Sequence, residues 1–319
     1  MVNTAVLFET FARPKYARQV FEQIKKAQPK KLYFYSNKAR IGYPEEMKNN
    51  EEIRSWVKEI DWDCELYTFF RDEYVDVYVS TFGAIDWVFR NEEEAIVLED
   101  DCVPSQAFFM YCEHFLNKYK NDKRICVISG DNYVEGLDYD GADHVITSSF
   151  FMFGWASWRD RWINADFNID VKHIIENEHI FEKYFIGDTR KVKFWKSYYK
   201  NIYDFLNKTH CWDYMFSLNC IRQKTYVVAP IEHLVQNVGI VGTHAPGKEN
   251  ATNKSIDLEK KNYQVTNKII NVIPNKVYDE LSFNILFNYP FSLKSRMKRL
   301  VRPVVRPIKG ILKYFSCYK

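Results

Sequence analysis

Several features that would assign a chain to a familiar class are missing from this one. The seven cysteines are scattered, odd in number and form no C-x-x-C pair. This argues against a disulfide scaffold and a zinc site, and it suits a reducing compartment. No stretch of about 18 apolar residues occurs, so we expect no transmembrane helix. The first residues lack a basic segment followed by a long apolar one, which predicts no signal peptide and a cytosolic protein.

A general excess of basic residues is also absent. The formal net charge is only +3, and nine of the 45 Lys and Arg residues lie between Ser292 and Lys319, where there is no Asp or Glu. The rest of the chain is mildly acidic, with 36 basic against 42 acidic residues. The body of the chain therefore lacks the charge that suits a nucleic-acid partner, and we expect none.

What the sequence does contain is enough apolar material for a large α/β domain, since 46% of its 319 residues are hydrophobic. Short apolar runs predict strands over 4–8, 31–35, 65–70, 94–98 and 125–129. Segments of helical periodicity between them predict helices over 15–26, 51–60, 75–90 and 104–119. Such alternation is typical of a mostly parallel sheet with helices on both faces.

Three acids follow the strand predicted over 94–98. Ligands of open α/β sheets bind at the carboxyl ends of the strands, and Glu99, Asp100 and Asp101 would repel one another there unless a cation joined them. A hard divalent ion with oxygen ligands is the natural partner, and it would bridge the phosphates of a nucleoside diphosphate. The alternative interpretation is an acidic turn that caps the next helix.

Two tryptophans, Trp155 and Trp158, lie three residues apart with Gly154, Ala156 and Ser157 around them. The small residues predict close backbone packing beside a flat aromatic wall, on which a sugar ring could stack. Packing of large aromatic side chains in the core explains the same pattern.

Two single residues are also candidates. Asp213 stands between Trp212 and Tyr214 in an otherwise apolar segment. Burial there would raise its pKa and make it a better proton acceptor, although it could equally be a helix N-cap. His244, in a glycine-containing loop after Gly239, could bind a metal, bind a phosphate or do neither.

Taken in order, these clusters resemble a known group of enzymes. The resemblance is carried by Arg13-Pro14, Glu99-Asp100-Asp101, Gly154 to Arg159, Trp212-Asp213-Tyr214, and Asn237-x-Gly239 with Thr243-His244. It points to the bacterial nucleotide-diphospho-sugar transferases related to the HlpA family and, more distantly, to N-acetylglucosaminyltransferase I. It covers about residues 4–245 and implies a GT-A (Rossmann-like) fold.

The resemblance implies a metal-dependent hexosyl- or N-acetylhexosaminyltransferase. The expected donor is a nucleotide-diphosphate-sugar, first of all a UDP-sugar, and the expected acceptor is a glycan or lipid-linked glycan of a surface polysaccharide. Mn²⁺ or Mg²⁺ would bind Asp101, with His244 closing over it, and Asp213 would be the general base of an inverting displacement. The other implied donor-site residues are Thr10, Arg13, Ser36, Asn37, Arg71, Glu99, Asp100 and Trp155.

The same reasoning divides the chain. Residues 1–245 are expected to form the GT-A domain, with a nucleotide-binding part over 1–130 and an acceptor part over 131–245. Residues 246–290 predict a polar loop and a small strand-and-turn appendage, and 291–319 a basic tail.

Basic and apolar residues are interleaved in this tail, as in segments that lie on an anionic bilayer. We therefore expect a peripheral protein on the inner face of the cell membrane, although a disordered basic tail would have the same composition.

Two other functions fit parts of the pattern. A nucleotidyltransferase that makes a nucleotide-sugar would use a glycine-rich loop after the first strand, but residues 9–14 contain no glycine. A non-catalytic sugar-binding protein at the membrane is the second alternative, and the four acids at 99, 100, 101 and 213 argue against it.

Overall fold

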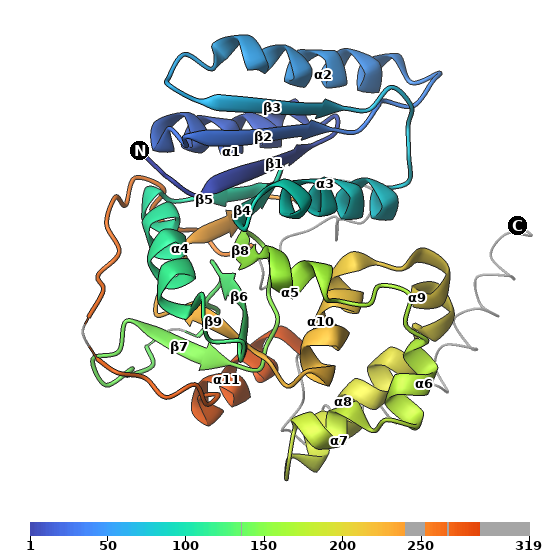
Figure 1. Ribbon diagram of the computed structural model, residues 1–319, viewed down its shortest axis with the longest axis vertical. Helices are drawn as coiled ribbons and strands as arrows, with labels where there is room; N and C mark the ends of the chain where they lie inside the picture. The colour runs from blue at the N-terminus through green and yellow to red at the C-terminus, as the bar shows by residue number, and fades with distance from the viewer. Residues whose placement is uncertain (135, 240–252, 267, 288–319) are drawn as a thin grey trace, which may run out of the picture.

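The computed structural model describes residues 1–134, 136–239, 253–266 and 268–287 (Figure 1). Its strands are β1 (Ala5–Thr10), β2 (Lys31–Ser36), β3 (Glu65–Phe70), β4 (Glu94–Glu99), β5 (Cys102–Pro104), β6 (Ile125–Ser129), β7 (His144–Thr147), β8 (Trp155–Trp158), β9 (Tyr226–Pro230) and β10 (Val235–Asn237). The helices of the N-terminal half are α1 (Pro14–Ala27), α2 (Pro44–Ser55), the short 3₁₀ helix η1 (Trp56–Glu59), α3 (Val77–Asn91) and α4 (Gln106–Tyr119). Those of the C-terminal half are α5 (Arg159–Ile163), α6 (Val171–Glu176), α7 (Ile180–Tyr184), α8 (Thr189–Lys200), α9 (Tyr203–Thr209), α10 (Trp212–Arg222) and α11 (Lys276–Phe287).

Eight strands form one sheet in the order β3-β2-β1-β4-β8-β6-β9-β7, while β10 and β5 form a separate antiparallel ribbon. The pairs β1–β2, β1–β4, β2–β3 and β6–β9 are parallel. Strand β8 runs antiparallel to both its neighbours, and β7 is antiparallel to β9. The prediction of an α/β fold with a mostly parallel sheet flanked by helices is therefore confirmed.

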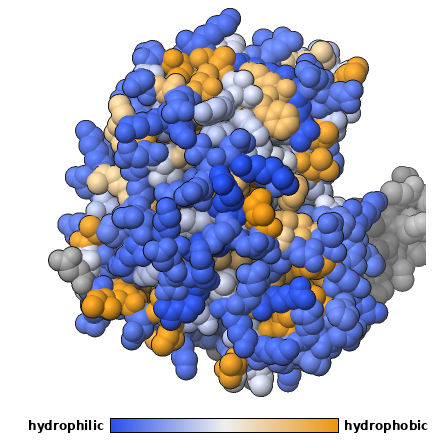
Figure 2. Space-filling view, viewed as in Figure 1, coloured by the Kyte–Doolittle hydropathy of each residue, from blue (hydrophilic) through white to orange (hydrophobic). Residues whose placement is uncertain are grey.

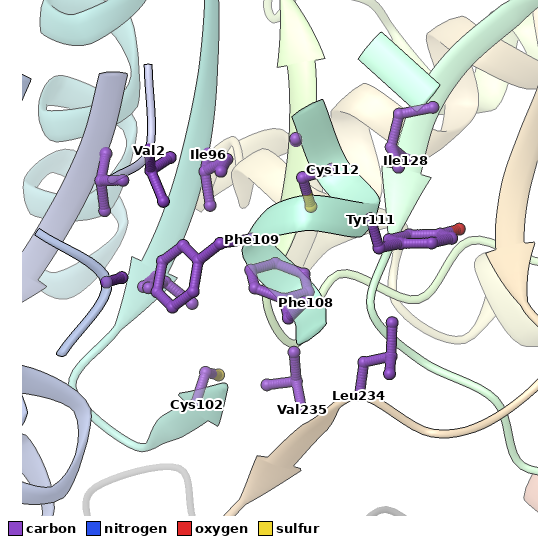
Figure 3. Packing of buried hydrophobic residues seen from close by; sticks show 14 of the residues in the cluster. Val2, Ile96, Cys102, Phe108, Phe109, Tyr111, Cys112, Ile128, Leu234 and Val235 are labelled. Atoms are coloured by element: carbon purple, nitrogen blue, oxygen red, sulfur yellow. The ribbon is translucent and has the colours of Figure 1, made fainter. Parts of the chain in front are cut away.

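Alternating side chains along the strands divide the core between the two faces of the sheet. Phe8 and Leu98 belong to the cluster under α1 and α4, whereas Leu7 and Val97 belong to the cluster under α3 and α10. On the first face, α4 directs Phe108, Phe109, Tyr111 and Cys112 into the core, where they lie near Ile96, Ile128 and Val235 (Figure 3). Both clusters position the ends of β1 and β4.

The predicted nucleotide-binding part (1–130) and acceptor part (131–245) share this sheet, because β7, β8 and β9 come from the second part. That part adds the helices α6 to α10, which enclose a third apolar cluster (Figure 1). The helices α6 to α9 lie apart from β1, β2 and β3 (Figure 1).

The prediction of strand and turn over 266–290 was wrong in its second half, where α11 is a helix. Asn275 initiates it, because its side-chain oxygen accepts hydrogen bonds from the backbone N–H groups of Val277 and Tyr278. Asp279 then accepts hydrogen bonds from Ser148 N and the Thr147 hydroxyl, which fastens α11 to the end of β7. The sequence of this segment did not distinguish a helix cap at Asn275 from a turn, because the contacts of Asp279 that hold the helix in place are tertiary.

Two predictions fall outside the described residues, namely the role of His244 and the basic tail over 291–319. Within the described ranges, no helix has the length and apolar character needed to cross a membrane. The face in Figure 2 is largely hydrophilic, with hydrophobic residues scattered over it.

The connection between β9 and β10 contains a buried, neutral histidine. His233 is 8% exposed, and its Nδ1 accepts a hydrogen bond from the backbone N–H of Asn132 at 2.9 Å. Its Nε2 is buried without a partner among the described residues. Burial, with a smaller effect of Lys254, lowers the pKa of His233 to about 3. The protonated form is therefore disfavoured in the folded state.

We expect this histidine to make the fold sensitive to acid. Below its ordinary pKa of about 6.5 the unfolded chain takes up a proton that folded His233 refuses, so stability falls as the pH falls. Between pH 7 and pH 5 the loss from this group should be about 2 kcal/mol. The free energy of unfolding, measured with urea at several pH values in this range, should depend less steeply on pH in His233→Asn than in wild type. The asparagine side-chain oxygen can still accept the hydrogen bond from Asn132 N.

The exposed residue His179 provides the control. Its backbone is left-handed, with φ of 52°, a conformation that asparagine tolerates. His179→Asn should keep the wild-type pH dependence. An equal slope in His233→Asn and wild type would contradict the prediction.

Candidate active site

A cavity of about 1190 Å³ opens at the carboxyl ends of β1, β2 and β4. The strand ends contribute Glu9, Thr10, Asn37, Glu99, Asp100 and Asp101. The lining also includes Phe153, Tyr198, Tyr214, Asn237 and Gly239. Polar groups thus converge at one edge of the sheet, where parallel strands of an open α/β fold place their ligands.

Arg13 supplies positive charge beside the acids at these strand ends. It precedes α1, and its guanidinium forms ion pairs with Asp100 and, at 3.0 Å, with Asp101. Its Nε also lies 3.3 Å from Asp100 Oδ2. One guanidinium therefore holds two adjacent carboxylates, and the loop after β1 is tied to the end of β4.

Asp100 and Asp101 differ in their access to the cavity. The Asp100 side chain is 6% exposed and that of Asp101 14%. Burial raises the pKa of Asp100 to about 6, although Arg13 acts in the opposite direction. Asp101 is consequently the better placed of the two to meet an incoming ligand.

The oxygen donors of this edge fit a hard divalent cation in kind. Carboxylates at Asp100 and Asp101 are the ligands that Mg²⁺ and Mn²⁺ prefer. Within the described ranges, however, no three His, Cys, Asp or Glu side chains are grouped as a ready metal site. Arg13 pairs with both carboxylates, so a metal would have to share them with it.

Gly239 lies directly against Asp101. The ribbon of β10 with β5 brings it there, and Val238 N donates a 2.8 Å hydrogen bond to the Asp101 carbonyl. A Cβ at position 239 would lie 2.2 Å from Asp101 Oδ2, so a larger residue would displace the carboxylate. Position 239 requires glycine because of this close approach. The sequence alone did not indicate that Gly239 contacts Asp101.

Glu9 and Glu99 are a second pair of acids at the same edge. They are register partners at the ends of the parallel strands β1 and β4. Burial raises the pKa of both, to about 8 for Glu9. Glu9 was not among the residues predicted from the sequence. A carboxyl group directly after the apolar run over 4–8 was a usable signal for it.

Asp213 lies in the first turn of α10 rather than at its N-cap, which is Cys211. Its Oδ1 accepts hydrogen bonds from Tyr214 N at 2.8 Å and from the Cys211 thiol at 2.9 Å. Burial raises its pKa. Asp213 itself is not among the cavity-lining residues, but its neighbour Tyr214 is. The structure therefore places Asp213 beside a cavity-lining residue in sequence, but not its carboxyl group on the cavity wall.

Of the other predicted donor-site residues, Thr10 and Asn37 line the cavity, whereas Ser36, Arg71 and Trp155 do not. Ser36 is fully buried and accepts hydrogen bonds from Asn50 and Arg54. Arg71 packs against α3, where a Cβ on Gly83 would meet it at 2.6 Å.

Trp155 is fully buried and stacks on Trp212, with ring centroids 5.5 Å apart. It therefore belongs to the core, as the alternative interpretation of the tryptophan motif proposed. The aromatic residues that do line the cavity are Phe11, Tyr43, Tyr74, Phe153, Tyr198 and Tyr214. Tyr214 belongs to a motif that the sequence singles out and Phe153 directly precedes another, whereas the other four come from segments that no local motif reveals.

Comparisons with known proteins give only remote similarities. No protein-family model and no curated protein matches the chain. A solved mannosyltransferase, PcManGT from Pyrobaculum calidifontis in complex with GDP-Man and Mn²⁺, shares 15% identity over 50% of this chain and 45% of its own, with a TM-score of 0.35. The glycosyltransferase GlyE of Streptococcus pneumoniae shares 12% identity over 63% and 44% of the two chains, with a TM-score of 0.29. A UDP-glucose pyrophosphorylase complexed with UDP-glucose shares 10% identity over 74% and 93%, with a TM-score of 0.32.

The chain thus spans less than half the length of the two glycosyltransferase chains. These identities and TM-scores are too low to transfer an activity to it. The resemblance to the HlpA-related family and to N-acetylglucosaminyltransferase I stays a prediction.

Proposed function

We propose that this protein is a metal-dependent glycosyltransferase that moves a sugar from a nucleotide-diphosphate-sugar to a glycan or lipid-linked glycan. A UDP-sugar is the first donor to test, and surface-polysaccharide synthesis is the proposed setting. The observation that carries the proposal is the convergence of Arg13, Asp100 and Asp101 at the strand ends of a cavity of about 1190 Å³. That volume accommodates a nucleotide-sugar.

In this proposal Asp101, helped by Asp100, holds Mn²⁺ or Mg²⁺, and His244 completes the site. The ion would neutralise the charge that grows on the departing diphosphate. Arg13 would bind the same diphosphate, while Thr10 and Asn37 would contact the nucleoside. Asp213 would accept a proton from the acceptor hydroxyl as that oxygen attacks the anomeric carbon, which gives inversion.

Hydrolysis of a nucleotide-sugar panel tests the proposal. Purified protein is incubated with each donor in Mn²⁺, in Mg²⁺ and in chelator, and the release of nucleoside diphosphate is measured. Slow, metal-dependent release from one donor supports a transferase and names the donor. Pyrophosphate release from a nucleoside triphosphate and a sugar 1-phosphate would instead indicate a nucleotidyltransferase. Absence of turnover and of ligand-induced thermal stabilisation with every donor would contradict the proposal.

The basic tail is proposed to place this enzyme on an anionic membrane. Its nine Lys and Arg residues lack acidic neighbours between Ser292 and Lys319. The helix α11, which precedes it, exposes Val277, Leu281 and Ile285 along one face at intervals of four residues. An apolar stripe beside a basic segment suits the interface of a negatively charged bilayer.

Flotation with liposomes tests this placement. The full chain should float with vesicles that contain anionic lipid, and a chain truncated after residue 291 should stay in the soluble fraction. Binding should weaken as salt is raised, because screening reduces the attraction to the headgroups. Zwitterionic vesicles provide the control, and equal flotation of the two forms would contradict the proposal.

A further inference from the structure

Glu9 is a buried carboxyl group that is only half satisfied. It is 8% exposed, and its Oε1 accepts a 2.6 Å hydrogen bond from the Thr81 hydroxyl on α3. Its Oε2 is buried without a hydrogen-bond partner among the described residues. A buried polar atom of this kind calls for an explanation, and Glu9 lines the cavity in which a ligand could supply the missing hydrogen-bond partner.

The register of the sheet places Glu9 in a polar row. On the face that α3 covers, Leu7 is paired with Tyr33 on one side and Val97 on the other, all within one apolar cluster. Two residues further along β1, Glu9 is paired in the same way with Tyr35 and Glu99. The apolar row therefore turns polar where β1 and β4 reach the cavity.

The charges around this row favour an uncharged hydrogen-bonding group on the ligand. Arg13 directs its guanidinium to Asp100 and Asp101, and the Tyr35 hydroxyl bonds with Ser80 and Arg71. The negatively charged diphosphate is expected beside Arg13 rather than beside two glutamates. A hydroxyl group can form a hydrogen bond with a carboxyl group, as donor or as acceptor, without bringing negative charge.

We propose that Glu9 Oε2 forms a hydrogen bond with a hydroxyl group of the transferred sugar, so that Glu9 and its neighbour Glu99 select the donor sugar by the configuration of its hydroxyls. This inference rests on the proposed function. The transferred sugar fits better than the nucleoside, because the same sheet face carries α10, whose first turn contains the proposed base Asp213. Glu9 is assigned here as a specificity residue that touches the donor.

The test compares two ligands of one variant. Glu9→Met keeps the length of the side chain but has no group that can pair with a sugar hydroxyl or with Thr81. The Kd of the nucleotide-sugar selected by the hydrolysis panel should rise about tenfold or more, since the hydrogen bond to the sugar is lost. The Kd of the matching nucleoside diphosphate should stay within about twofold of wild type. Both are measured by titration calorimetry with Mn²⁺.

Asp131→Asn is the control for the loss of a buried acid. Asp131 is 1% exposed, but its oxygens are satisfied by Tyr133 and Phe153 and it does not line the cavity. Its Kd values should equal those of wild type. Thr81→Val keeps both Glu9 oxygens but removes the hydroxyl that orients them, so it should show a smaller selective loss. It serves if Glu9→Met fails to fold.

The outcomes separate the two proposals. Unchanged nucleotide-sugar binding in Glu9→Met, or an equal loss for both ligands, would overturn the assignment of Glu9 while leaving the transferase proposal intact. Failure of the wild-type protein to bind either ligand with any metal would overturn the proposed function and this inference with it.

Discussion

Asp213→Asn should lower kcat for sugar transfer by about 10²- to 10⁴-fold, the range attributed to a general base. The amide keeps the size of the side chain and an oxygen that can accept from Tyr214 N, but it cannot take the proton of the acceptor hydroxyl. The Kd of the donor should change little, because the loss falls on a step after donor binding. Initial rates at saturating donor and acceptor measure the effect.

A helix cap elsewhere in the chain provides the control for Asp213. Asp170 is the N-cap of α6 and accepts hydrogen bonds from Lys172 N and His173 N. Asparagine is as good a cap, so Asp170→Asn should keep both stability and kcat. If Asp213→Asn behaves in the same way, Asp213 has a structural role only and the base must be sought elsewhere.

Asp101→Ala should abolish metal-dependent turnover, with a loss of at least about 10²- to 10³-fold in kcat. The carboxylate is the more exposed of the two that Arg13 binds, and Gly239 packs against it. Its removal takes away the proposed metal ligand and frees Arg13 to pair with Asp100 alone. The residual rate should no longer respond to Mn²⁺ or to chelator.

Asp122 offers a control for this change. It is an aspartate paired with Arg124 in a different part of the surface, 2.7 Å from it. Asp122→Ala removes an ion pair of the same kind without touching the cavity, and its rate should match wild type. Wild-type metal dependence in Asp101→Ala would contradict the metal assignment and the donor site with it.

Much of the fold could be predicted because local signals and tertiary packing agree in the first half of the chain. The acids at 99, 100 and 101 follow a buried strand, and the ends of parallel strands meet at one edge of a sheet. Their proximity to Arg13 at the end of β1 follows from the same rule. The pairing that puts Glu9 beside Glu99 could not be predicted, because it depends on which strands are neighbours and in which register.

The second half of the chain shows where local reading fails. Trp155 could face a sugar or the core, and the choice depends on the antiparallel insertion of β8 between β4 and β6. Tyr198 and Tyr214 reach the cavity only because α8 and α10 pack together. The hydroxyl oxygens of the two tyrosines lie 2.8 Å apart. Such positions are set by helix packing, which sequence periodicity does not specify.

The central place of β4 has a consequence for how this protein opens. β4 is paired on both edges, with β1 on one side and β8 on the other, so its amide protons should be among the last to exchange with solvent. The short helices α6 to α9 are held by side-chain packing rather than by strand pairing, and they can detach in partial unfolding. The acids at the end of β4 would then persist in a partly open molecule whose cavity has lost Tyr198 of α8. Under the proposed function, such a molecule would still bind a nucleotide while being unable to transfer its sugar.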